Sequence, residues 1–284
     1  MSMSIVYLNG NFMPIEEAKI SPLDRGFLFG DGIYEFIPIY AGRPIGFEYH
    51  IDRMLTGLKN IRVNIDELDW HTIIEKLLSE NEGGNVGLYI QVSRGADTKR
   101  THNFPTDVEP TVFIMTQKIA GLVEPNIKTA KGYSLVSSLD RRWDNCHIKS
   151  TSLLGNVMHF QHGYENKVDE TLLYNDKEEL TECSACNVFI IKGDQICTPI
   201  LDNQILPGVT RRIMIEAINS DPSLQFTERA ITLQEAKNAD ELWITSSTKQ
   251  IAPVIQLDGL PIGTGQVGAV WKKCQELYDG IKFS

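Results

Sequence analysis

The sequence has no long apolar run, no cationic cluster and no secretory leader, and each absence excludes a class of protein. No stretch stays apolar over the roughly 18 residues that a membrane-spanning helix needs. A formal net charge of −10, without any run rich in lysine or arginine, disfavours nucleic acid and anionic membranes as partners. The first residues carry neither the basic segment nor the apolar stretch of a signal peptide. We therefore expect neither a nucleic acid nor a membrane among the partners.

Cysteine is scarce, and its spacing does not indicate a disulfide framework. The five cysteines are Cys146, Cys183, Cys186, Cys197 and Cys274. An odd number without a paired pattern is typical of a reducing compartment, so we expect a cytoplasmic protein. Cys183 and Cys186 have the spacing of half a zinc site, but no second pair of ligands completes it. We expect no metal.

The period of the apolar residues predicts strands and helices in both halves of the chain. Asn9-Gly10 accepts the positive φ of a tight turn and predicts a hairpin of residues 5–8 and 11–13. Further strands are expected at 35–40, 43–47, 86–92, 111–116, 133–136, 170–174, 188–191, 241–245 and 254–257. Helices are expected at 71–78, 152–165 and 210–218, around the apolar face Ile51, Met54, Leu55 and Leu58, and at 267–278 with Val267, Val270, Cys274 and Leu277 on one face.

A change in pattern after residue 117 predicts two domains. Gly121 and Pro125 punctuate a segment of weak periodicity. We expect a small α+β domain over residues 1–117, a linker over 118–125 and a larger domain over 126–284. The length of 284 residues is ample for two such cores.

Two residues have the chemistry that pyridoxal phosphate requires of a protein. A lysine can bond to the cofactor's aldehyde carbon, and a carboxylate can keep the pyridine nitrogen charged. Lys149 follows Asn145-Cys146-His147-Ile148, and Glu182 stands in Thr181-Glu182-Cys183. A lysine taken alone is most often a surface residue, so the interpretation depends on what accompanies the pair.

Three segments favour an anion such as phosphate. Pro207-Gly208 delivers the start of a helix at Val209 and Thr210, where backbone N–H groups and a hydroxyl are available. A predicted strand ends in Ser246-Ser247-Thr248, although such a run also occurs in plain turns. Arg53, after His50-Ile51-Asp52, adds a guanidinium suited to phosphate.

Together these motifs resemble the fold-type IV (class IV) pyridoxal phosphate aminotransferases, and among them the bacterial D-amino acid transaminases, or D-alanine aminotransferases. The matching motifs lie at 24–35, 50–53, 91–95, 148–150, 181–182, 187–189, 206–211 and 240–248. The resemblance implies an α+β / α/β fold of two domains, the second with a β-barrel-like core and flanking helices. It implies pyridoxal 5′-phosphate as cofactor. Its roles carry over onto eight positions: Lys149 as the cofactor-binding and proton-shuttling lysine, Glu182 on the pyridine nitrogen, Arg53, Val209, Thr210, Ser246 and Ser247 at the phosphate, and Arg142 near the phenolic oxygen.

The loop 94–105 distinguishes between members of the family. In the D-amino acid transaminases an Arg-x-His triplet in this loop, with the tyrosine of Gly-Asp-Gly-x-Tyr-Glu, binds the substrate carboxylate. Here these are Arg100, His102 and Tyr34. The resemblance implies a homodimer in which the loop reaches the neighbouring subunit's active site. It predicts amino transfer between a D-alanine-like amino acid and a 2-oxo acid, pyruvate or 2-oxoglutarate.

Two related activities stay open as alternatives. Branched-chain aminotransferases act on L-amino acids and share the lysine and the glutamate, but they usually lack the Arg-x-His loop and differ at Ser246-Ser247-Thr248. Aminodeoxychorismate lyases release pyruvate with the same cofactor and typically depart from the pair Tyr34-Glu35. Ala185 and Cys186, where the family commonly has serines, leave the substrate range open.

Overall fold

A computed structural model describes residues 4–81 and 83–284, which form two compact units. The first contains Met1–Gly121 together with Ile148–Leu153, and the second contains Leu122–His147 with Leu154–Ser284. The chain first passes from one unit to the other within the segment 118–125. Residues 148–153, which the sequence analysis placed in the larger domain, belong to the first unit. Their backbone pairs there with strand β3 (Gly32–Tyr40). The spacing of apolar residues along the sequence could not predict this long-range pairing.

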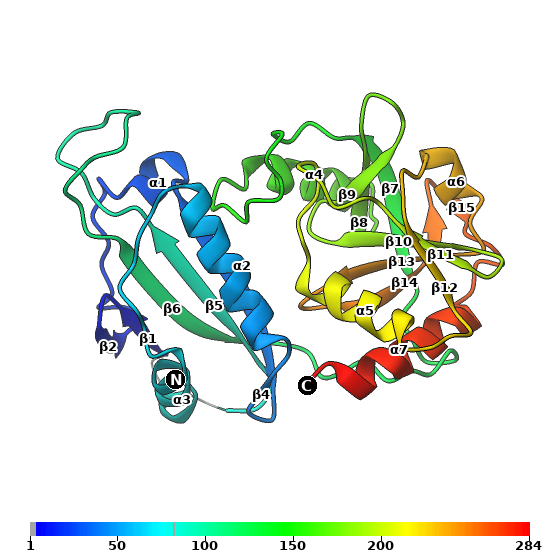
Figure 1. Ribbon diagram of the computed structural model, residues 1–284, viewed down its shortest axis with the longest axis horizontal. Coiled ribbons are helices and arrows are strands. Elements are labelled where there is room, and N and C mark those ends of the chain that lie inside the picture. Colours follow the sequence, from blue (N-terminus) through cyan, green and yellow to red (C-terminus); the bar gives the residue numbers. More distant parts are fainter. Residues whose placement is uncertain (1–3, 82) are drawn as a thin grey trace. The chain divides into compact units, whose positions relative to one another are not determined.

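The first unit is a six-stranded sheet of order β2-β1-β6-β5-β3-β4 with helices packed on it (Figure 1). Its other strands are β1 (Ile5–Leu8), β2 (Asn11–Pro14), β4 (Arg43–Pro44), β5 (Val86–Ser93) and β6 (Thr111–Lys118). The predicted hairpin is confirmed, because β1 pairs with β2 around Asn9 and Gly10, both at positive φ. Central strands β3 and β5 pair over their whole length and are buried on both faces at most positions.

Two helices cover this sheet, and a short helix lies between β2 and β3 in the chain. They are α1 (Arg25–Phe29), α2 (Phe47–Asn60) and α3 (Trp70–Glu80). Ile51, Met54 and Leu58 of α2 are buried as predicted, but Leu55 is exposed because the apolar stripe is narrower than expected. The predicted strand over 43–47 is also too long: β4 stops at Pro44, and Gly46 at φ 58° begins α2 at Phe47.

The second unit is built on a nine-stranded sheet of order β12-β11-β10-β13-β14-β7-β8-β9, with β15 on β14. The strands are β7 (Tyr133–Leu139), β8 (Glu170–Tyr174), β9 (Leu180–Cys183), β10 (Asn187–Lys192), β11 (Gln195–Thr198), β12 (Gln225–Glu228), β13 (Glu241–Ser246), β14 (Gln250–Leu257) and β15 (Leu260–Pro261). Edge strand β9 also contacts β10, so the sheet curls back on itself as a half-barrel. This matches the expected mixed fold with a barrel-like core.

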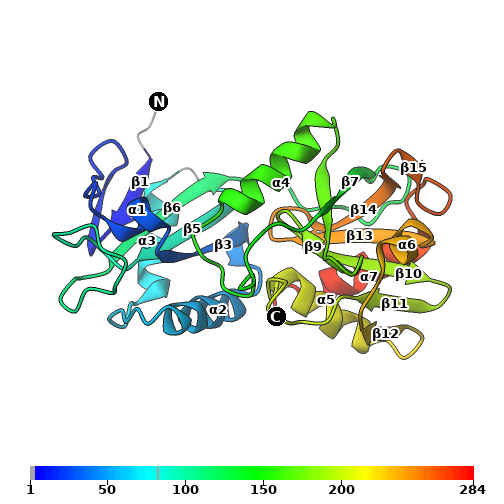
Figure 2. The same cartoon turned by 90° about the horizontal axis from the view of Figure 1, so that it is seen from above.

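Four helices complete the second unit: α4 (Leu154–Glu165), α5 (Val209–Asn219), α6 (Leu233–Lys237) and α7 (Ala269–Ile281). Figure 2 shows α5 beside α7, and the two are in contact. Of the predicted apolar face of α7, Cys274 is buried as expected, but Val270 and Leu277 are only half-buried, because the buried positions are Trp271, Cys274, Gln275 and Tyr278. The large indole of Trp271 settles the register: its Nε1 donates to the Ile251 carbonyl at 2.9 Å. Within 4–81 and 83–284, no helix has the length and apolarity to cross a membrane.

Candidate active site

Lys149 and Tyr34 meet in the first unit although they are distant in sequence. The backbone N–H of Tyr34 donates to the Lys149 carbonyl at 3.1 Å, and Ile33 forms a bridge with Ser150. The Lys149 Nζ stands 4.0 Å from the centre of the Tyr34 ring. Both side chains are half-buried. The arrangement places a primary amine against a phenol at the end of the central strand pair.

A buried ionic cluster lies beside this pair. Glu35, fully buried on β3, accepts Arg53 Nε and Nη2, each at 2.7 Å, and pairs with His50 Nδ1 at 2.7 Å. Burial alone would raise the pKa of Glu35, but the Arg53 charge and its hydrogen bonds hold it well below the usual range. Burial lowers the pKa of His50, although Glu35 opposes this. Arg53, predicted as a phosphate ligand, is therefore oriented by a carboxylate that the sequence analysis assigned no role.

The loop with Arg100 and His102 is organised around one aromatic ring. The Arg100 guanidinium lies 4.9 Å from the centre of the Phe29 ring, and the His102 ring centre lies 5.5 Å from it. Both loop residues are exposed. Within the described chain, neither a hydrogen bond nor an ion pair nor a ring contact joins them to Tyr34. The structure thus brings the predicted pair together but does not place it at the predicted third partner.

Two buried arginines, Arg25 and Arg94, contact this loop and are joined to each other through Asp31. Arg25 donates Nη1 to the Thr101 carbonyl at 2.7 Å and Nε to Asp31 Oδ2 at 2.8 Å. Arg94 donates Nε to the same Asp31 oxygen at 2.8 Å, and its guanidinium lies 3.7 Å from the centre of the Phe104 ring. Sequence reasoning missed Arg25 and Asp31. The sequence indicated these two residues only by their charges: Arg25 begins a short helix capped by Asp24 and Gly30, and Asp31, of opposite charge, follows it.

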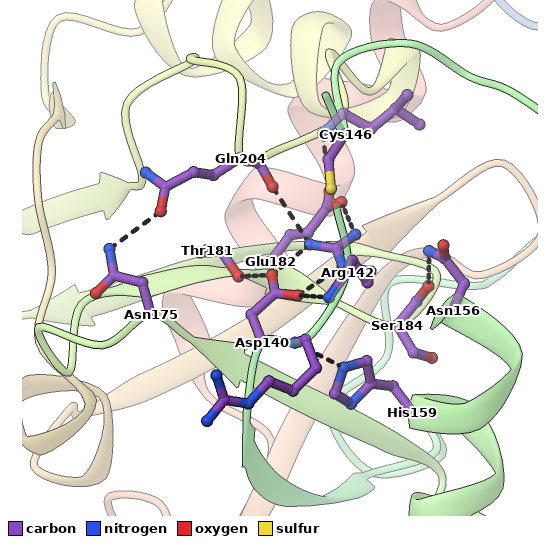
Figure 3. A network of polar contacts seen from close by, with 12 residues as sticks. Asp140, Arg142, Cys146, Asn156, His159, Asn175, Thr181, Glu182, Ser184 and Gln204 are labelled. Atoms are coloured by element: carbon purple, nitrogen blue, oxygen red, sulfur yellow. Dashed lines mark hydrogen bonds and ion pairs between the residues drawn. The ribbon is translucent and has the colours of Figure 1, made fainter. Parts of the chain in front are cut away.

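In the second unit, Glu182 is buried at the centre of a polar network (Figure 3). Its Oε1 accepts Arg142 Nη1 at 2.5 Å. Its Oε2 accepts Asn187 Nδ2 at 3.0 Å and the backbone N–H of Leu206 at 3.1 Å. Burial raises the pKa of Glu182, and Arg142 counteracts that rise. Such donors stabilise the charged form of a carboxylate that burial disfavours.

Arg142 is shared between Glu182 and a second carboxylate, Asp140. Asp140 follows β7 and accepts Arg142 Nε at 3.0 Å and Nη2 at 2.7 Å. Thr181 Oγ1 donates to Asp140 Oδ2 at 2.7 Å. Burial would raise the pKa of Asp140, but the Arg142 hydrogen bonds and charge lower it. The carboxylates also raise the pKa of Arg142, so its guanidinium stays charged.

The start of α5 offers donors without a side-chain cap. Gly208 is the N-cap residue and makes no side-chain hydrogen bond, so the first amides of the helix have no cap partner. Thr210 and Val209 are buried in this first turn. A Cβ on Gly208 would lie 2.0 Å from Asn187 Oδ1, so glycine is required for this close approach. Because Asn187 bonds both Glu182 and the Leu206 carbonyl, the helix start is tied to the carboxylate.

The end of β13 gives a second polar edge in this unit. Residue Thr245 pairs with Asn187 across β10 and β13, so the neighbouring Ser246 follows at the same edge. Ser246 Oγ accepts the backbone N–H of Lys249 at 3.2 Å, and Ser247 is half-buried in the turn. The Thr245 hydroxyl is buried without a hydrogen-bond partner among the described residues. The predicted hydroxyl run thus starts at the last residue of β13 and continues as a turn, next to the buried hydroxyl of Thr245.

Cys183 and Cys186 are free, buried thiols with raised pKa values. Burial raises the pKa of Cys186 to about 12. Its Sγ lies 3.7 Å from Glu170 Oε2 and 3.8 Å from Lys249 Nζ. Buried thiols of raised pKa pack as small apolar groups.

Each unit therefore presents groups of complementary chemistry. The first offers an amine against a phenol and a guanidinium fixed by a carboxylate. The second offers a buried carboxylate beside a helix N-terminus, which favours an anion. A ligand with both a basic ring nitrogen and a phosphate would use the two features of the second unit together.

Residues 32–257 match the family described as Amino-transferase class IV. The D-alanine aminotransferase of Staphylococcus haemolyticus is 35% identical over 279 residues, which are 96% of each chain. That of Staphylococcus aureus (strain N315) is 36% identical and covers 98% of this chain and 97% of its own. Among solved structures, the branched-chain amino acid aminotransferase of Thermobaculum terrenum in its PLP-bound holo form has a TM-score of 0.85 at 18% identity, over 99% of this chain and 94% of its own. The Escherichia coli branched-chain enzyme has a TM-score of 0.88 at 20% identity, over 99% and 94%.

Proposed function

Because the chain belongs to the class IV aminotransferases, we propose that it transfers an amino group between a D-amino acid and a 2-oxo acid, with pyridoxal 5′-phosphate as cofactor. The amino donor would resemble D-alanine, and the acceptor would be pyruvate or 2-oxoglutarate. Support comes from the relatives named D-alanine aminotransferases, which this chain matches over nearly their whole length. The branched-chain enzymes share the fold, and their low identity carries no argument about substrate.

The residues present fit this cofactor. In the first unit, Lys149 offers the amine that would bond to it, and Arg53, held by Glu35, offers a guanidinium. In the second unit, Glu182 offers a buried carboxylate for the ring nitrogen. The α5 N-terminus with Thr210, and the turn with Ser246 and Ser247, offer amide and hydroxyl donors for the phosphate. Arg142, bonded to Glu182, would lie at the ring rather than at the phosphate.

Three roles follow for the side chains of this protein. When bound, the cofactor supplies an electron-accepting ring that stabilises negative charge at the substrate's α-carbon. Lys149 Nζ takes the proton from that carbon as a general base. Glu182 holds a proton on the ring nitrogen, which deepens the electron sink. Arg100 and His102, with Tyr34, bind the carboxylate and so determine which enantiomer presents its hydrogen to Lys149.

The observation that carries the D-amino acid assignment is the shared position of Arg100 and His102 on Phe29. Two cationic or donor side chains fixed on one ring form a ready carboxylate site. Because neither contacts Tyr34, we propose that the loop acts in the site of a second copy of the chain.

A homodimer is the arrangement we propose, in the cytoplasm. Helix α4 supports it with an outward face of large apolar residues, of which Leu154 is 74% and Met158 62% exposed. Val157 and Tyr164 extend this face. A contiguous exposed apolar surface is typical of a protein interface. The free, reduced cysteines are consistent with a reducing compartment.

The experiment that tests the function is a half-reaction followed by the cofactor's visible absorption. The purified holoprotein should lose its visible band on addition of D-alanine, with one pyruvate formed per site, and should keep it with L-leucine. Bleaching by L-leucine alone would place the protein with the branched-chain enzymes. A band that neither amino acid changes would favour a lyase.

Two variants sharpen this test. Lys149→Ala should abolish bleaching, and substantial residual turnover would contradict the assignment. Arg100→Ala should raise the D-alanine concentration needed for half-maximal bleaching by about 10- to 100-fold, because one charge-assisted pair to the carboxylate is lost. Lys99→Ala, an exposed neighbour in the same loop, is the matched control and should behave as the wild type.

A further inference from the structure

The charges around Glu182 do not balance. Glu182 and Asp140 each carry a negative charge, and Arg142 is the single cationic side chain bonded to either of them within the described part of the chain. The side chains are 7%, 12% and 3% exposed, respectively. With both carboxylates ionised, two anions and one cation leave a net charge of −1 among three mostly buried side chains. Asp140 and Arg142 also line a cavity whose other charged residues are Asp144, Asp176, Lys177 and Glu179. A buried net charge is unfavourable unless a further cation completes the cluster.

Asp140 holds the larger share of the guanidinium. It accepts two Arg142 donors, Nε and Nη2, in the parallel geometry of a bidentate pair, and also the backbone N–H of Arg142 at 3.0 Å. Glu182 receives Nη1 alone. Bidentate pairs are stronger and more strictly oriented than single contacts. The orientation of Arg142 is therefore fixed by Asp140.

Asp140 is also tied to the strand that carries Glu182. Thr181, which donates its hydroxyl to Asp140, is the residue before Glu182 on β9. The opposite carboxylate oxygen of Glu182 is held by Asn187 and Leu206. Asp140 thus bonds both Arg142, the cation beside Glu182, and Thr181, the residue before Glu182, as Figure 3 shows.

We propose that Asp140 is a positioning residue that compensates the charge of Arg142, so that the negative charge of Glu182 stays uncompensated and favours a proton on the ring nitrogen of the cofactor. This inference rests on the proposed role of Glu182. Without the Asp140 charge, Arg142 and Glu182 would compensate each other and the cluster would be neutral. Glu182 would then attract a proton on the ring nitrogen less strongly. With the charge present, the cluster needs one cation, and a protonated ring nitrogen provides it.

The test measures the ring nitrogen directly by ¹⁵N NMR of the holoprotein, reconstituted with cofactor labelled at that nitrogen. In Asp140→Asn, the pH at which the nitrogen loses its proton should fall by about one pH unit or more, a tenfold change in proton affinity. The dissociation constant of pyridoxal phosphate should rise by about tenfold for the same reason. Asp140→Glu keeps the charge and should largely restore the wild-type titration.

Matched controls separate charge from damage. Asp194→Asn makes the same change at an exposed side chain of the second unit that does not line the cavity beside Asp140 and Arg142, and it should leave the nitrogen signal unchanged. Asp140→Ser is a second neutral variant that keeps an acceptor for Thr181, so the test survives if Asp140→Asn fails to fold. Thermal unfolding of each variant shows which of them are folded.

The outcomes distinguish this inference from the proposed function. In an Arg142→Gln background, Asp140→Asn should have a smaller effect on the nitrogen than in the wild type, because only the direct effect of the Asp140 charge remains and the part that acts through the guanidinium is gone. An equal effect in both backgrounds, or a folded Asp140→Asn and Asp140→Ser with wild-type titration, would overturn the role of Asp140. If Glu182→Gln itself leaves the nitrogen unchanged, the role of Glu182 fails instead.

Discussion

Buried carboxylates in both units depend on one or two immediate neighbours. Glu35 depends on Arg53 and His50, and Glu182 depends on Arg142 and Asn187. Removing one partner from a buried pair leaves the other charge uncompensated, which is costlier than removing both. Small changes next to these carboxylates should therefore have large effects.

Gly208→Ala tests this dependence without touching a charged group. The new Cβ would lie 2.0 Å from Asn187 Oδ1, and Asn187 is pinned by Glu182 and Leu206. Overpacking of this kind costs about 1–3 kcal/mol of unfolding free energy. Displacement of Asn187 should also weaken cofactor binding. Denaturant unfolding and a cofactor titration measure the two effects.

Gly280→Ala is the matched control, because nothing lies within 4 Å of a Cβ at that helical position. It should stabilise the protein by about 0.5–1 kcal/mol, since alanine is the better helix former. Equal behaviour of the two variants would show that Asn187 moves away freely.

Sequence patterns found the reactive side chains more readily than their supports. Lys149 and Glu182 stand in motifs that identified the family, and the comparisons confirm that family. Asp140 and Arg25 each have a charged partner nearby in sequence, but they were missed because the bonds that tie them to the site go to remote residues: Thr181 for the first and Thr101 for the second. Pairings of that kind depend on which strands and loops fold together. The roles of the individual site residues stay predictions.

Helices and strands with a strong period were predicted well, and short polar ones were not. Strand β8 has the predicted bounds, Glu170–Tyr174, and contains the apolar run Leu172-Leu173-Tyr174 that marks it in the sequence. Strand β9, Leu180–Cys183, was missed because its buried residues include Thr181 and Glu182. The site lies where the polar residues break the apolar pattern, so secondary-structure prediction is weakest there.

Helix α4 combines an inner polar face with an outer apolar one. Asn156 Nδ2 donates to the Ser184 carbonyl at 2.7 Å, and His159 Nε2 accepts the backbone N–H of Arg141 at 3.2 Å. Leu154, Met158 and Tyr164 are exposed. This is the reverse of a surface helix on a monomer, whose apolar stripe faces inward.

Val157→Glu with Met158→Glu should therefore dissociate the proposed dimer. Each buried side chain of this size contributes about 1.5–3 kcal/mol, so the dimer dissociation constant should rise by at least about 100-fold. Sedimentation equilibrium measures it. Leu260→Glu adds a charge at another exposed apolar side chain of the second unit, outside α4, and serves as the control. A double variant that remains dimeric would assign the interface to another surface.

The family resemblance predicted the fold class, but it did not predict how the chain passes between the two units. The two-unit architecture and the curled sheet agree with the expectation. The return of residues 148–153 to the first unit is a long-range pairing that local patterns do not encode.

Protein stability should fall on acidification, because two buried groups of the first unit take up protons on unfolding. Burial lowers the pKa of His50, so the folded chain keeps it neutral while the unfolded chain protonates it below about pH 6.5. The pKa of Glu35 is lowered by Arg53 despite burial, so a second loss begins below about pH 4.3. In both cases the unfolded state binds more protons as the pH falls. The melting temperature measured between about pH 8 and about pH 2 should therefore decline in two stages, the first below about pH 6.5 and the second below about pH 4.3.

His50→Gln should flatten the first stage, and the exposed His71→Gln should leave it unchanged. A melting temperature independent of pH between about 7 and 5 in the wild type would contradict the neutral state of His50.

The six residues Ile148–Leu153 also constrain how the first unit folds during synthesis and which fragments of the chain can be produced alone. During synthesis, residues 1–121 leave the ribosome before this segment does. Until the segment emerges, the backbone N–H of Tyr34 and the carbonyl of Gly32 lack their hydrogen-bond partners in Lys149 and Thr151. Meanwhile, residues 122–147 of the second unit have already emerged. A gene fragment ending at Gly121 would encode a sheet without its last partner. A protein designed to contain the first unit alone should therefore include residues 148–153, joined to residue 121 by a designed linker.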